Sequence, residues 1–65
     1  MISTLRGILV LKHANVIVIE TNGVGYEVIV PLSIIDKLPV EGEKVFLHIH
    51  TYVKDNNIEL YGFLT

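Results

Sequence analysis

The sequence contains no cysteine, which excludes disulfide bonds and metal sites built on thiolates. A small chain that cannot form a large core gains extra stability from disulfides, from metal ions or from association. With disulfides and thiolate cages excluded, association with further copies or with partners is the expected source. The 65 residues are enough for one globular domain, and no linker or low-complexity segment divides them, so we expect a single domain over residues 1–65.

Charge of either sign is scarce and evenly scattered. Five basic and seven acidic residues give a net charge of −2, and neither sign forms a run. A protein that binds nucleic acid by itself needs a basic field to displace counterions from the phosphates, so the composition argues against an autonomous nucleic-acid binder.

Long apolar stretches are also lacking, since unbroken apolar runs such as residues 8–11 are far too short to cross a bilayer. The N-terminus lacks the basic region and long apolar segment that are typical of a signal peptide. We therefore expect a soluble intracellular protein without a membrane partner.

The apolar residues that are present recur at every second position or in short runs rich in Val and Ile, and turn-forming residues interrupt them at short intervals. This pattern is typical of an all-β sandwich or barrel. It predicts a short helix between the third and fourth strands and five strands, over residues 2–11, 16–20, 24–30, 44–53 and 58–63. This order favours an OB-fold, a five-stranded Greek-key barrel, with an SH3-like barrel as the main alternative.

Local signals refine these elements. Asn22-Gly23 tolerates the positive φ angles of a type I′ hairpin turn. Gly25 lies within a strand and therefore predicts a bulge or a close backbone approach. Ser33 fits the capping box of a short helix that Pro39 ends, and residues 54–57 form the tip of the last hairpin.

The strands differ in how many of their faces are apolar. In residues 44–53 the side chains of Val45, Leu47 and Ile49 alternate with polar or aromatic ones, which predicts one buried face. Residues 8–11 and 16–19 are apolar on both faces, although a small barrel has only one interior. Either the helix and the chain ends cover the second face, or it forms a protein interface. Ile17 and Ile19 are the candidate interface residues.

No catalytic or cofactor site emerges from the residues. His48 and His50 share a face, but no third metal ligand accompanies them. Asp55, Asn57 and Glu59 resemble the start of a calcium loop without its glycine and its final bidentate acid. We therefore expect a non-catalytic protein with no metal and no cofactor.

Three motifs occur together in one order: MISTLRG at residues 1–7, NGVGYEV at 22–28 and LYGF at 60–63. The chain, from Met1 to Phe63, resembles the N-terminal domain of the bacterial Holliday-junction branch-migration protein RuvA. The resemblance implies a homotetramer in the bacterial cytoplasm, associated with the nucleoid, that holds four-way junction DNA open while the ATP-driven motor RuvB moves the arms. The resolvase RuvC belongs to the wider complex. In that family helix-hairpin-helix elements and a motor-binding domain follow, and neither is present in these residues.

The same family carries two neighbouring carboxylates, an acidic pin, on the hairpin between the fourth and fifth strands. The matching positions here are Asp55 and Asn56, so the second carboxylate is replaced by a neutral amide and Lys54 adds a positive neighbour. The resemblance implies a weakened pin centred on Asp55, with Asn57 and Glu59 as possible supplements. A plain structural module and a generic single-strand binder are the other function classes.

Overall fold

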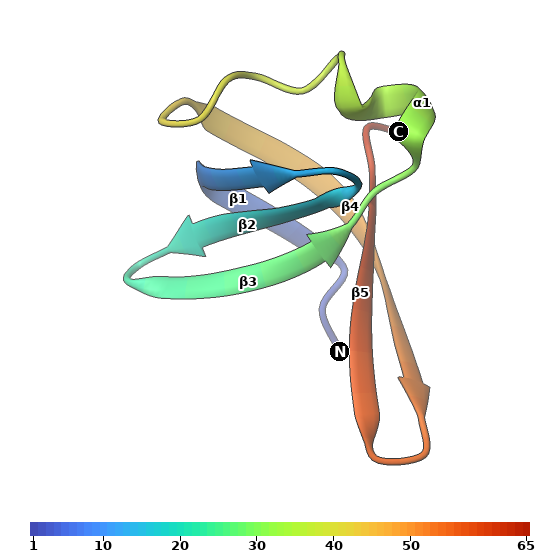
Figure 1. Ribbon diagram of the computed structural model, residues 1–65. Coiled ribbons are helices and arrows are strands. Elements are labelled where there is room, and N and C mark those ends of the chain that lie inside the picture. Colours follow the sequence, from blue (N-terminus) through green and yellow to red (C-terminus); the bar gives the residue numbers. More distant parts are fainter.

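The computed structural model describes all residues from Met1 to Thr65 and consists of five strands and one short helix (Figure 1). The chain order is β1 (Thr4–His13), β2 (Val16–Thr21), β3 (Val24–Ile29), α1 (Leu32–Ile35), β4 (Lys44–Lys54) and β5 (Asn57–Phe63). The predicted strands are all present, with ends that differ by at most a few residues.

The strands close into a barrel in the order β1-β2-β3-β5-β4. Neighbouring strands are antiparallel except for β3 and β5, which run parallel and meet at the pair Ile29–Tyr61. One helix lies between β3 and β4, as it does in the OB-fold. The prediction of an all-β, five-stranded OB-fold barrel is therefore confirmed.

The helix begins differently from the prediction. Pro31 is its N-cap, with φ −61° and ψ 143°, and no side chain caps its first turn. Ser33 lies inside the single turn rather than before it, so the predicted capping box is wrong. The fixed φ of proline already sets the chain at the angle from which the turn starts. The Pro39 stop is not needed, because the helix ends at Ile35.

Two glycine predictions have different outcomes. Asn22 and Gly23 have φ angles of 52° and 86°, which confirms the positive φ pair of the predicted hairpin turn. At Gly25 the β2–β3 register continues without a shift, so a bulge there is wrong. The nearest group to a Cβ at Gly25 would be a methyl of Val18, at 3.2 Å. The irregularity in the barrel lies instead in β1, between Leu9 and Leu11.

Eleven apolar side chains form the buried core, and they come from all five strands and from the segments before and after α1. Val45, Leu47 and Ile49 point inward, as their alternation predicts. Ile17 and Ile19 do so too, and both are 0% exposed. The prediction that these two side chains contact another subunit is therefore wrong. Every second side chain of β2 points into the barrel, and the pairing of β2 with β1 and β3 makes Ile17 and Ile19 the inward ones.

Candidate functional site

The last two strands extend beyond the barrel as a two-stranded arm (Figure 1). Their antiparallel pairing continues outward to the pair Lys54–Asn57, and every residue from 52 to 58 is exposed. Val53 and Ile58 form a cross-strand pair near the tip and are 63% and 71% exposed. Because β4 and β5 are longer than the barrel requires, the arm holds its tip away from the core.

The tip consists of Asp55 and Asn56, which join the two strands. Asp55 has a φ of 55°, in the left-handed region that aspartate and asparagine tolerate better than most residues. None of the side-chain hydrogen bonds in the structure involves Asp55 or Asn56. Asp55 is thus an exposed carboxylate without a hydrogen-bond partner in the protein, and Lys54 is its basic neighbour in the chain.

The two residues named as supplements are arranged differently. Asn57 is the first residue of β5 and pairs with Lys54, directly beside the tip. Glu59 lies further from the tip and pairs with Tyr52, and its Oε1 accepts a hydrogen bond of 3.1 Å from the hydroxyl of Tyr61. Nowhere in the structure do three or more His, Asp or Glu side chains group closely enough to hold a metal ion.

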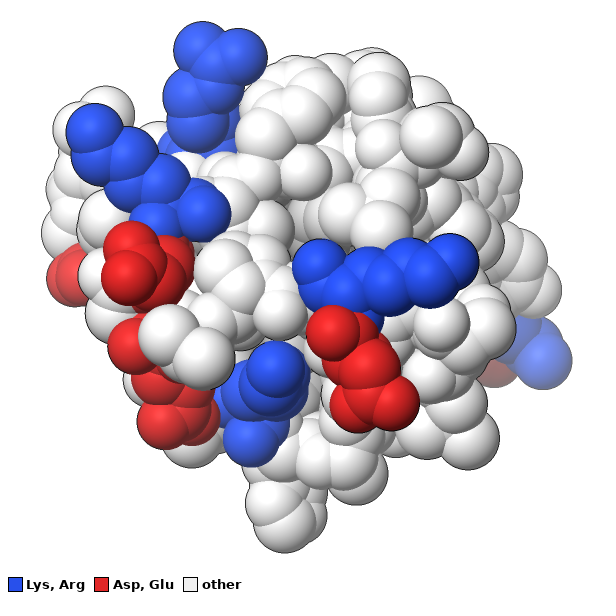
Figure 2. Space-filling model, turned by 90° about the horizontal axis from the view of Figure 1, so that it is seen from above, with Lys and Arg blue, Asp and Glu red and all other residues white.

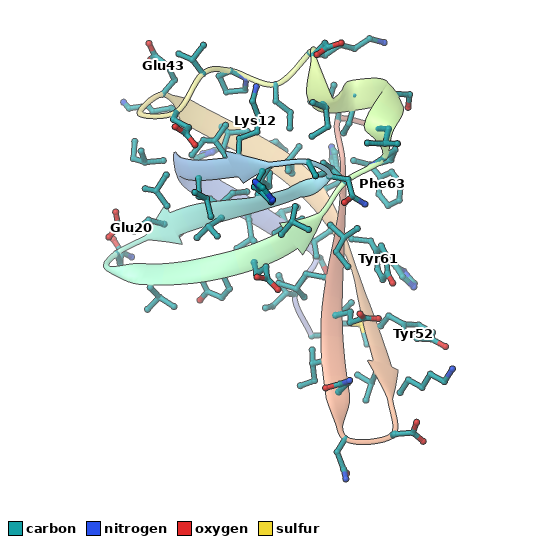
Figure 3. The ribbon with its side chains drawn as sticks, in the orientation of Figure 1. Lys12, Glu20, Glu43, Tyr52, Tyr61 and Phe63 are labelled. Carbon is teal, nitrogen blue, oxygen red and sulfur yellow. The ribbon has the colours of Figure 1, made fainter.

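Aromatic side chains line the outer face of the arm and of its base. Tyr52, Tyr61 and Phe63 project from the same side of the β4–β5 pair (Figure 3). The rings of Tyr52 and Tyr61 meet edge to face, with centroids 6.5 Å apart and planes at 78°. Edge-to-face contact is a favoured arrangement of aromatic pairs, so it stabilises the base of the arm, where Tyr61 pairs with Ile29 of β3.

The hydrogen bond to Glu59 is the largest of the causes that raise the pKa of Tyr61 above 10.0, and partial desolvation and the negative charges of Glu59 and ionised Tyr52 add to it. We expect Tyr61 to ionise at a higher pH than an isolated tyrosine, and Glu59→Ala to lower its titration midpoint, as followed by tyrosinate absorbance. The raised pKa stabilises the fold below pH 10.0, and this contribution disappears as the pH rises through the folded-state value. Identical titrations of the two proteins would contradict the assignment.

A second group of polar and aromatic side chains lies on the barrel itself, where β1 pairs with β4. Arg6 pairs with Phe46 and Thr4 pairs with His48. The sequence did not indicate this group, because nothing in it shows that Arg6 and Phe46 are cross-strand neighbours. The alternation of β4 alone was the one signal that placed Phe46 and His48 on a common face.

The overall surface charge is mixed. Viewed from the end of the barrel that carries α1, basic and acidic side chains lie next to one another and leave a wide uncharged area (Figure 2). A hollow of 340 Å³ also opens between β3 and β5, where the two strands separate beyond their single pair, and Glu27 and Glu59 are among its lining residues. No large basic field is present on this end view, in agreement with the low net charge.

No helix in the structure has the length and apolar character needed to cross a membrane.

Comparison with protein families finds a match to the RuvA N terminal domain over residues 1–62. Among known proteins, the chain is 51% identical over its 65 residues to the Holliday junction branch migration complex subunit RuvA of Solibacter usitatus, and 49% identical to that of Geobacter sulfurreducens. The alignments cover 100% of this chain and 33% of each relative, so the chain spans about a third of their length.

Proposed function

Because this chain belongs to the RuvA N-terminal domain family, we propose that it is the junction-shaping N-terminal domain of a Holliday-junction branch-migration subunit. The observation that supports this most directly is the arm, which extends beyond a barrel of the same family and presents the exposed carboxylate of Asp55 at its tip. The remaining two thirds of the relatives' length would supply the helix-hairpin-helix elements and the part that binds the motor.

In this proposal the domain acts without catalysis. The barrel holds the arm in a fixed direction, and the arm places Asp55 at the centre of a four-way junction. A carboxylate close to a phosphate repels it by about 1 kcal/mol at 4 Å in water, and by more where water is excluded. This repulsion favours separated strands at the crossover. The energy for moving the DNA arms of the junction comes from the RuvB motor. RuvC acts on the same junction in the wider complex.

We further propose that four copies of the subunit surround the junction. The net charge of −2 means that one barrel has little affinity for DNA, so binding must come mainly from the domains that follow in the relatives. A tetramer would bring four arm tips to the crossover and thus multiply a repulsion that is small at each tip. The domain therefore functions only as part of the tetramer. We place this tetramer in the bacterial cytoplasm, near the chromosome.

A chimera tests the proposed function. Residues 1–65 replace the corresponding segment of the Geobacter sulfurreducens relative, to which they are 49% identical. We expect the chimera to bind a four-way junction in preference to linear duplex and to support RuvB-driven branch migration, while the 65-residue chain alone shows neither. A correctly folded chimera without junction preference would contradict the proposal and favour a purely structural module.

A further inference from the structure

The outer faces of β1 and β4 carry a cluster that we call the basic patch, composed of Arg6, Lys44, Phe46 and His48. All four side chains are exposed. The guanidinium carbon of Arg6 lies 5.0 Å from the centroid of the Phe46 ring, and the His48 ring meets Phe46 edge to face at 5.3 Å. A shallow depression of 280 Å³ is lined by three of these residues and by Val45. The aromatic ring thus sits between cationic and imidazole groups at the edge of an open hollow.

The positive charges of the basic patch have no acidic partner. Neither Arg6 nor Lys44 donates a side-chain hydrogen bond to a carboxylate. The nearest acids along the chain and across the strands are Glu43, which precedes Lys44, and Glu20, which pairs with Ile8. Stacking on Phe46 holds the Arg6 guanidinium in place while its N–H groups remain available, and a guanidinium matches the geometry of a phosphate.

The basic patch is continuous with the arm along one strand. The outward side chains of β4 follow one another at every second position without an acid among them: Lys44, Phe46, His48, His50, Tyr52 and Lys54. On β5, the one acid that points to the same side is Glu59, which lies opposite Tyr52 and already accepts a hydrogen bond from Tyr61. An anionic polymer would therefore be attracted near the basic patch and repelled near the middle of the arm.

We propose that the basic patch binds a backbone phosphate of one duplex arm of the junction, with Arg6 and Lys44 as the phosphate ligands and Phe46 packed against the adjacent sugar. This inference rests on the proposed function. At 3.3 Å per strand residue, Phe46 lies about 26 Å from Lys54 along β4. That length corresponds to about eight base pairs of duplex. With the tip at the crossover, the bound phosphate is thus about eight base pairs from the crossover along a duplex arm of the junction.

The test uses the chimera described above and measures junction affinity at several salt concentrations. Arg6→Gln with Lys44→Gln is expected to weaken binding about tenfold at low salt and to reduce the slope of log K against log salt by about 0.9 for each phosphate contact that is lost. Lys37→Gln, an exposed lysine next to α1, is the matched control and should leave the slope unchanged. Arg6→Lys with Lys44→Arg keeps both charges and should keep the slope.

A second measurement locates the contact. Neutral methylphosphonate linkages placed about eight base pairs from the crossover should weaken binding by the unsubstituted chimera and have no effect on the Arg6→Gln, Lys44→Gln variant. Equal salt slopes for this variant and the unsubstituted chimera, together with retained junction preference, would overturn the basic-patch proposal and leave the proposed function intact. If the Arg6→Gln, Lys44→Gln variant changed its mass in sedimentation but kept the salt slope of the unsubstituted chimera, the basic-patch proposal would be overturned in favour of contact with another protein copy. Loss of junction preference in the unsubstituted chimera would overturn both proposals.

Discussion

Ile17→Asp is expected to abolish cooperative folding of the isolated chain. Ile17 is 0% exposed and lies among the eleven side chains of the barrel core. The change removes a core side chain, which costs about 2–5 kcal/mol for an isoleucine cut to alanine. It also buries a carboxyl group without a partner, at a further cost of several kcal/mol. A domain of this size rarely has more than about 3–5 kcal/mol in total. Far-UV circular dichroism and thermal unfolding will measure the loss.

The matched control for this experiment is Val18→Asp, one position further along β2. Val18 lies on the opposite face of the strand and is only half-buried, so a carboxylate there keeps access to water. We expect this variant to retain a cooperative transition. The opposite pattern, a folded monomeric Ile17→Asp protein, would mean that Ile17 faces a subunit interface and that the barrel register is wrong.

Ile17 also shows where sequence reasoning reached its limit. The run from Val16 to Ile19 is apolar at every position, so period-2 alternation gives no indication of which face is buried. The answer depends on pairing with β1, which has an irregularity between Leu9 and Leu11 that shifts one side of the ladder. In β4 the aliphatic residues Val45, Leu47 and Ile49 alternate with aromatic or polar ones, and there the buried face could be predicted.

The candidate site divides in the same way. The arm tip could be located because Asp and Asn between two strand patterns signal a turn, and the structure places the turn at Asp55 and Asn56. The basic patch could not be located, because it depends on the pairing of Arg6 in β1 with Phe46 in β4. A turn can be predicted from a few neighbouring residues. A site assembled from the first and fourth strands exists only once the barrel has closed, so it cannot be predicted in that way.

The charge at the arm tip should control how far the junction opens, and it can be varied in both directions. In the chimera, Asp55→Asn removes the one carboxylate, and Asn56→Asp adds the second one that the family pattern contains. We expect the first change to reduce strand opening at the crossover by at least about fivefold, since about 1 kcal/mol of repulsion is lost at each tip, and the second to increase it by a similar factor. A fluorescent base analogue at the crossover reports the opening.

Salt separates this electrostatic effect from a change in shape. The Debye length falls from about 10 Å at 0.1 M salt to 3 Å at 1 M, so the differences among Asp55→Asn, Asn56→Asp and the unsubstituted chimera should shrink as salt is raised. Both positions are exposed and make no side-chain hydrogen bonds, so thermal unfolding should be nearly the same in all three proteins. Equal opening in all three at low salt would show that the tip acts by its shape alone, and Asp55 would then have no role as an acidic pin.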